Sequence, residues 1–117
     1  MNIKTSDITG PVLDWAVAKA EGHDVAVAEG TGLILIRRGF VADYFDPSTN
    51  WGWGGPIIER ECISITHERP DGSGWTAETD AGHDDQSEHG PTPLIAAMRC
   101  FVASKLGDEI DVPEELK

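Results

Sequence analysis

Apolar residues recur at helical spacing near the two ends of the chain. In the stretch TGPVLDWAVAKAEG, Pro11 suits the first position of a helix and Gly22 suits its end. In PTPLIAAMRCFVASKLG, Thr92 can cap a helix that starts at Pro93 and ends before Gly107. The apolar face of the first helix consists of Leu13, Ala16, Val17 and Ala20, and that of the second of Leu94, Met98, Phe101 and Val102. This spacing predicts two main helices.

Short stretches of alternating or β-branched residues between these helices predict strands. The stretches DVAVA and GLILIRR flank a glycine-bearing turn and are typical of a hairpin. CISITHE and WTAET flank the turn RPDGSG in the same way. Their inward positions add Ile34, Ile36, Ile63 and Ile65 to the predicted core. The order helix, strands, helix predicts an α+β fold, with an antiparallel β-sheet and the two main helices packed on one face.

Three further segments complete the predicted single domain, residues 1–117. The stretch FDPSTNWGWGGPIIERE, residues 45–61, is interpreted as a glycine-rich loop that ends in a short helical turn. Residues 80–90 form a polar, acidic segment without Lys or Arg, and we expect a mobile loop there. Residues 108–117 form an acidic tail, and we expect its apolar residues Ile110, Val112 and Leu116 to dock on the body.

Composition excludes several classes of protein. The chain has 117 residues and a formal net charge of -12, and its nine Lys and Arg residues are scattered, which argues against nucleic-acid binding. Its longest apolar run, LILI, is too short to span a bilayer, and the N-terminus lacks an apolar signal segment, so we expect a cytoplasmic protein. Cys62 and Cys100 are expected to be reduced core thiols. The acidity favours solubility over mimicry of a nucleic acid.

The tryptophans of residues 45–61 mark the candidate binding site. Trp51 and Trp53 alternate with glycines, which leave ring faces and backbone N–H groups accessible to a planar or anionic ligand. Arg60 and Arg99 are candidate partners for an anionic group, and Thr92 stands where the last helix begins. The expected ligand-binding residues are Asp46, Ser48, Thr49, Asn50, Trp51, Trp53, Gly54, Gly55, Arg60, Thr92 and Arg99. The alternative is that the tryptophans cover the core and the arginines belong to a solvated surface.

Other site chemistry has little support in the sequence. His83, Asp84, Asp85 and His89 have no standard zinc-ligand spacing, and we predict no metal site and no cofactor. No nucleophile elbow, phosphate-binding loop or dinucleotide fingerprint is present, and no catalytic residue is assigned. The sequence therefore favours a binding protein over an enzyme.

Three segments of the chain resemble the NinX-type proteins of lambdoid phages and prophages. They are MNIKTSDITGPVLDWAVAKAEG, FDPSTNWGWGGPIIERECIS and GPTPLIAAMRCFVASKLGDEIDVPEEL. The resemblance implies a phage accessory protein that acts in the bacterial cytoplasm, and it carries over no catalytic residue. By analogy with other small phage proteins, the first expected function is binding of a small nucleotide-like or anionic ligand, as in sequestration of a host signalling nucleotide. The second is binding of a host or phage protein, and the third is a small enzyme; self-association is open.

The charge of the chain predicts its behaviour with nucleic acids. We expect titration with duplex RNA or duplex DNA at low salt to show no binding, because phosphates require clustered cations and Arg37 and Arg38 are the single adjacent basic pair. Fluorescence anisotropy measures this directly. Tight binding that weakens steeply with added salt would contradict the expectation.

Overall fold

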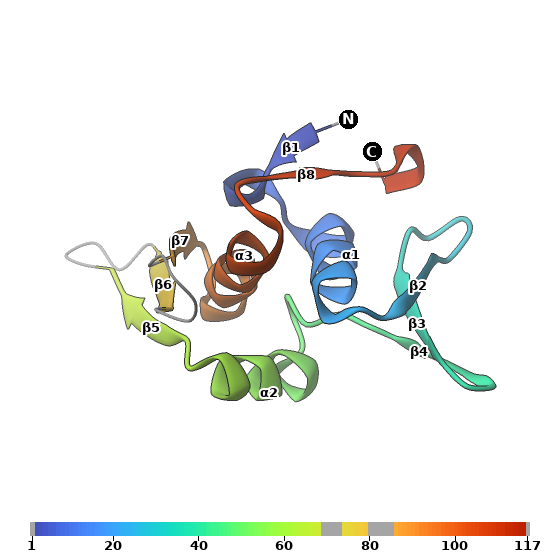
Figure 1. Cartoon of the computed structure of the whole chain (residues 1–117), viewed down its shortest axis with the longest axis horizontal. Helices are drawn as coiled ribbons and strands as arrows, with labels where there is room; N and C mark the ends of the chain where they lie inside the picture. Colours follow the sequence, from blue (N-terminus) through green and yellow to red (C-terminus); the bar gives the residue numbers. More distant parts are fainter. Residues whose placement is uncertain (1, 69–73, 80–85, 117) are drawn as a thin grey trace.

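Three helices form the centre of the molecule, with small sheets arranged around them (Figure 1). The computed structural model describes residues 2–68, 74–79 and 86–116. Within these ranges the helices are α1 (Gly10–Glu21), α2 (Trp51–Glu61) and α3 (Pro93–Leu106), with two single 3-10 turns, η1 (Thr5–Asp7) and η2 (Glu114–Leu116). The two termini lie at the same end of the molecule (Figure 1).

The strands of the described ranges form three antiparallel sheets. One sheet pairs β1 (Asn2–Lys4) with β8 (Glu109–Asp111). The second has the order β2 (Asp24–Val27), β3 (Ile34–Arg38) and β4 (Val41–Tyr44). The third has the order β5 (Ser64–His67), β6 (Trp75–Thr79) and β7 (Gln86–Gly90).

The predicted α+β class and the antiparallel pairing are confirmed, but the single sheet is not. Helix α2 separates β4 from β5 along the chain, so the two hairpins belong to different sheets. Helix α1 contacts β2 and β3, whereas α3 packs along β6 and β7. The predicted packing of both helices on one face of one sheet is therefore not confirmed. Each helix has its own small sheet instead (Figure 1).

The predicted helices α1 and α3 and their buried faces are confirmed. The Thr92 hydroxyl accepts a hydrogen bond from the Ile95 N–H at 3.1 Å, and Gly22 ends α1 in a left-handed conformation with φ 81°. The predicted core residues are buried except Ile65, which is half-buried: Leu13, Val17, Ile34, Ile36, Ile63, Leu94, Met98, Phe101 and Val102. The helical period thus identified the core faces correctly.

The glycine-rich stretch is helical, so the predicted loop is wrong from Trp51 to Gly55, whereas the helical turn predicted after it is confirmed as the second half of α2. Three glycines and a proline give α2 a poor intrinsic propensity, yet the helix forms because the rest of the fold stabilises it. The Asn50 side chain accepts a hydrogen bond from the Gly52 N–H at 2.8 Å and caps the first turn. Ile57 is buried in the core, and Gly54 is buried between Pro47 and Leu94.

Three other segments show where the sequence pattern was incomplete. The chain between Val41 and Tyr44 forms strand β4, which the sequence analysis left unassigned. Residues 86–90 of the predicted mobile loop form strand β7, and residues 80–85 lie outside the described residues. The docking of the acidic tail is confirmed, because Ile110 and Val112 are buried and Leu116 packs against the core.

The contact of α2 with α3 predicts that alanine substitution destabilises the protein at Gly54 but not at Gly55. A Cβ atom at Gly54 would lie 2.5 Å from Leu94 Cδ2 and 2.8 Å from the Pro47 carbonyl oxygen. We expect Gly54→Ala to lower the free energy of unfolding by about 1–3 kcal/mol, because backbone must move to relieve this overlap. Gly55→Ala meets nothing within 4 Å. We expect it to change stability by less than about 0.5 kcal/mol, because its gain in helix propensity is offset by crowding against Pro56.

Urea unfolding of the two variants measures the difference. A gain of stability in both variants would show that intrinsic helix propensity, and not contact with α3, limits α2.

Candidate functional site

The N-terminal ends of α2 and α3 meet around a cavity of about 260 Å³. The residues that line it come from the segment before α2 and from the first turns of both helices: Ser48, Thr49, Trp51, Thr92, Pro93, Leu94 and Ile95. The Asn50 and Thr92 side chains cap the Gly52 and Ile95 N–H groups of these first turns, and each helix dipole is positive at its N-terminal end. The cavity therefore combines an apolar wall with two helix ends that favour an anionic or acceptor group.

A buried carboxyl on α1 holds the segment that leads into α2. The Ser48 N–H donates a hydrogen bond to Asp14 Oδ1 at 2.9 Å, and both residues are buried. Downstream, the Asp46 carbonyl oxygen accepts hydrogen bonds from the Thr49 and Asn50 N–H groups at 3.0 and 2.9 Å. The Asn50 side chain also donates to Asp46 Oδ1 at 3.1 Å. The cavity wall is thus shaped by hydrogen bonds of the protein itself.

The Ser48 hydroxyl is a buried polar group without a hydrogen bond of acceptable geometry in the described structure. It lies close enough to the Asp14 carboxyl to help lower the pKa of that group. Buried hydroxyls are normally hydrogen-bonded, because loss of water without a replacement is unfavourable. Ser48 lines the cavity, but its hydroxyl oxygen is buried beside the Asp14 carboxyl.

The two tryptophans have different environments. Trp51 is 54% exposed and lines the cavity, so its ring is open to a planar group. Trp53 is half-buried, and its ring meets Phe45 edge to face at 5.1 Å. The guanidinium of Arg38 lies 5.6 Å from the centre of the Trp53 ring. Trp51 therefore belongs to the cavity, whereas Trp53 belongs to the packing between the β2–β3–β4 sheet and α2.

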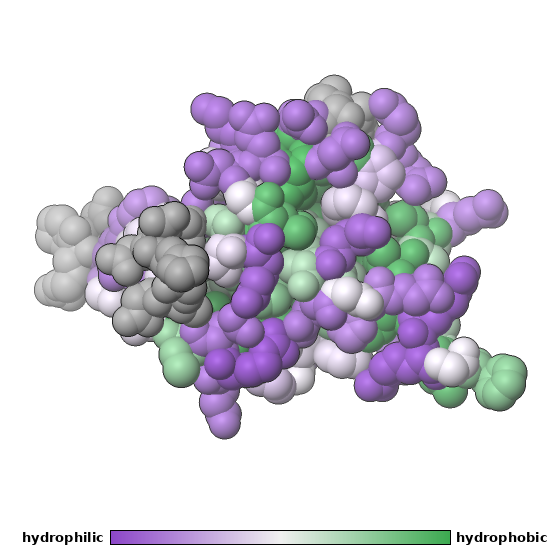
Figure 2. All heavy atoms as spheres, viewed as in Figure 1, coloured by the Kyte–Doolittle hydropathy of each residue, from purple (hydrophilic) through white to green (hydrophobic). Residues whose placement is uncertain are grey.

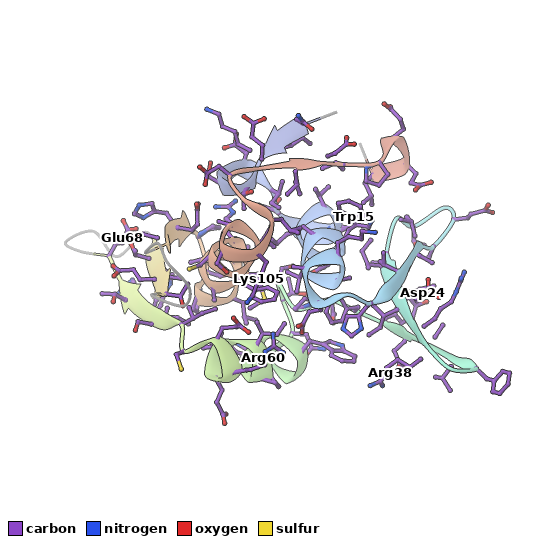
Figure 3. All side chains as sticks on the ribbon, in the orientation of Figure 1. Trp15, Asp24, Arg38, Arg60, Glu68 and Lys105 are labelled. Atoms are coloured by element: carbon purple, nitrogen blue, oxygen red, sulfur yellow. The ribbon has the colours of Figure 1, made fainter. Side chains whose placement is uncertain are left out.

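Arg60 is paired with acidic residues of the protein. It contacts Glu21 Oε2 at 2.8 Å and Glu61 Oε2 at 2.9 Å, and Lys105 contacts Glu61 Oε1 at 3.2 Å. The Arg60 hydrogen bond is the main cause that lowers the pKa of Glu61, and the same bond raises the pKa of Arg60. Figure 3 shows Arg60 on α2 and Lys105 on α3. These ion pairs connect the C-terminal ends of the three helices, away from the cavity.

Arg99 is likewise occupied by contacts within the protein. Its Nε donates to the Ile8 carbonyl oxygen at 2.9 Å, and its terminal nitrogen donates to the His89 carbonyl oxygen at 2.8 Å. Burial lowers the pKa of Arg99 from its usual value. Arg99 thus connects the segment before α1 and strand β7 to α3.

The structure brings together four of the eleven residues predicted for the site. Ser48, Thr49, Trp51 and Thr92 line the cavity, whereas Asp46, Asn50, Trp53, Gly54, Gly55, Arg60 and Arg99 are not among its lining residues. The glycines serve local structure: Gly54 allows close packing, and a Cβ at Gly52 would lie 3.0 Å from the capping oxygen of Asn50. No cation lines the cavity among the residues described.

Sequence reasoning missed the apolar wall and the buried acid of the site. Pro93, Leu94 and Ile95 were assigned to the last helix alone, and Asp14 was not considered. Asp14 lies three residues before Val17 and four before Ala18, so helical spacing places it on a buried face of α1. That spacing was the available signal.

Metal and membrane sites receive no support from the described ranges. No group of three or more metal-binding side chains is found there, and His83, Asp84 and Asp85 lie outside those ranges. None of the helices in the described part of the chain has the length and apolar content needed to cross a bilayer.

These features define a small, acidic α+β protein with a tryptophan-lined cavity between two helix N-termini. The model of the family described as "Bacteriophage P22, NinX" matches residues 4–105 of the chain. The chain belongs to this family, which confirms the resemblance seen in its sequence and indicates a phage accessory protein. A comparison with curated proteins found no match.

The environment of Asp14 predicts how stability depends on pH. Burial is the main cause that raises the pKa of Asp14 from 3.8 to about 6 in the folded protein. Between these values the folded protein keeps a proton that the unfolded chain has lost, so its stability falls as pH rises from about 4 to about 6. We expect Asp14→Asn to remove this dependence and to raise stability at pH 7.5 by about 1–3 kcal/mol. The Asn side-chain oxygen can still accept the Ser48 hydrogen bond.

Urea unfolding of both proteins between pH 4 and pH 7.5 measures the effect. The informative quantity is the difference between the two curves, because the other carboxyl groups titrate in both proteins. If the unfolding free energies of the two proteins change in parallel with pH, the raised pKa of Asp14 is contradicted.

Proposed function

We propose that the protein is a non-catalytic binder of a small, planar, anionic or nucleotide-like ligand, held in the cavity between α2 and α3. The observation that carries the proposal is the exposed Trp51 ring on the wall of the cavity, at the meeting point of two helix N-termini. Aromatic rings stack on planar groups with about 1–3 kcal/mol per base in nucleotide-binding proteins. The two helix ends favour the anionic group of the same ligand.

The dimensions and charge of the cavity limit the ligand that we propose. Its volume of about 260 Å³ lies slightly below the usual range for small-molecule pockets, so a single ring system suits it better than a dinucleotide. Arg60 and Arg99 are occupied by contacts within the protein, so they do not supply a phosphate clamp. The favoured ligand therefore carries one carboxylate or one phosphate. In the bacterial cytoplasm, such binding would remove a host metabolite or signalling nucleotide from use.

A second candidate function is binding of a host or phage protein. The exposed aromatic residues Phe40 and Tyr44 favour it, because exposed apolar side chains that gather on one element are typical of interaction surfaces. A small enzyme ranks third.

Ligand retention by matched tryptophan variants tests the proposal. We expect native mass spectrometry of protein purified from phage-infected cells to show a bound small molecule, and Trp51→Ala to lose it with little change in Tm. Trp53→Ala is the matched control: it should keep the ligand and lower Tm by roughly 5–10 °C, because its ring packs on Phe45.

Fluorescence titration with nucleoside monophosphates gives an independent measurement. A Trp51→Ala variant that retains the same ligand, or a wild-type protein that carries none and binds none of these probes, would contradict the proposal. A retained host protein in place of a small molecule would favour the second candidate.

A further inference from the structure

The β3–β4 hairpin projects from the body of the molecule with apolar residues at its end (Figures 1 and 2). Phe40 at its tip is fully exposed, and Val41 and Tyr44 are 57% and 63% exposed. The turn consists of Gly39 and Phe40, and Gly39 has φ 67° while Phe40 has no positive φ, which matches a type II′ turn. This turn gives the hairpin a defined register.

Strand β4 is an edge strand whose outer side has no neighbouring strand in the described structure. Arg38 is opposite Val41, and Phe45 donates its N–H to the Ile34 carbonyl oxygen at 2.9 Å. In antiparallel strands, hydrogen-bonded and non-hydrogen-bonded residue pairs alternate. The backbone N–H and C=O groups of Val41 and Asp43 therefore point toward β3, as those of Phe45 do. The N–H and C=O groups of Ala42 and Tyr44 therefore point away from β3, toward the open side.

Two of the residues that usually protect an edge strand from pairing are missing from β4. It contains no proline and no lysine. Its single charged residue, Asp43, contacts Arg38 of the same hairpin at 2.7 Å. Figure 3 shows Arg38 on this hairpin. The open edge is thus nearly neutral and flanked by exposed aromatic side chains.

Charge favours a second copy of the chain as the partner of this edge. Strands β2, β3 and β4 contain two Asp and two Arg residues, so their net charge is zero: Asp24, Arg37, Arg38 and Asp43. Arg37 lies 3.9 Å from Asp24, and Arg38 pairs with Asp43. The formal net charge of -12 therefore resides in the other segments. Two copies of so acidic a chain repel each other least where this sheet meets itself.

We propose that the protein forms a two-fold symmetric dimer in which β4 pairs antiparallel with β4 of a second copy, centred on Ala42. This register places Ala42 opposite its own copy and Tyr44 opposite the partner subunit's Phe40. The outward N–H and C=O groups of Ala42 and Tyr44 gain partners, and the exposed aromatic residues cover one another. Asp43 faces the partner subunit's Val41.

The neighbouring symmetric register is disfavoured by charge. Centred on Asp43, it would place two carboxylates directly opposite each other, which is destabilising in a sheet. A register shifted by a single residue would place the outward N–H and C=O groups of one β4 opposite residues whose N–H and C=O groups point toward β3. The hydrogen bonds between the two copies would then be lost. Because each copy contributes one strand of four residues, we expect the contact to bury less than the roughly 800 Å² per partner of a standard interface and to dissociate in the micromolar range.

Sedimentation equilibrium from low to high micromolar concentration tests the dimer. We expect a reversible monomer–dimer equilibrium for the wild-type chain. Ala42→Pro removes an N–H that β3 does not use, and by symmetry it removes two hydrogen bonds between the copies. It should weaken the dimer about 30-fold at unchanged Tm. Phe40→Ser should weaken it about tenfold or more, because two aromatic contacts are lost.

Leu106→Ser is the matched control, because Leu106 is also an exposed apolar residue, at 41%, and lies on α3 away from the hairpin. It should leave the dimer unchanged. A wild-type chain that stays monomeric throughout, or a dimer that Leu106→Ser weakens as much as Ala42→Pro does, would overturn the proposal. If Ala42→Pro lowers Tm, Phe40→Ser takes its place in this comparison, because the Phe40 side chain is fully exposed in the monomer.

Discussion

The close approach of α2 to α3 at Gly54 is the contact on which the arrangement of the molecule depends. Gly54 lies between the Pro47 carbonyl oxygen and the Leu94 side chain, with no space for a Cβ atom. This contact brings the first turn of α2 beside the first turn of α3, and it leaves the cavity between them. It also separates β4 from β5 in space, so that the strands of the chain form small sheets around the helices.

Paired and buried charges complete this arrangement in an acidic chain. The Asp14 carboxyl on α1 holds Ser48 at the beginning of the segment that leads into α2. Arg60, Lys105, Glu21 and Glu61 connect the other ends of the helices, and Arg99 connects α3 to the N-terminal segment through the Ile8 carbonyl oxygen. Cations are scarce in this chain, and Arg60, Lys105 and Arg99 stabilise contacts between its helices and neighbouring segments. The cavity between the helix N-termini therefore relies on backbone dipoles and hydroxyl groups for its polarity.

The cavity and the β3–β4 hairpin lie on different elements, and each has its own kind of chemistry. The cavity offers an aromatic ring, an apolar wall and two helix ends, which suit a small molecule. The hairpin offers an open backbone edge and exposed aromatic residues, which suit another strand. Arg38 connects the hairpin to α2, because it pairs with Asp43 on the hairpin and lies over the Trp53 ring on α2. A dimer formed through the hairpin would leave the cavity of each copy open.

The sequence by itself determined α1, α3, two hairpins and the core faces, because periodic burial and caps such as Thr92 are local signals. It also named Trp51 and Thr92 as candidate binding residues, and both line the cavity. Only the tertiary structure decided that the glycine-rich stretch is helical, since Gly54 and Ile57 pack against the rest of the fold and outweigh poor helix propensity. The same holds for the arginines. Whether a guanidinium meets a ligand or a carboxylate depends on which side chains the fold brings near it, and here those are Glu21 and Glu61 for Arg60 and two backbone carbonyl groups for Arg99.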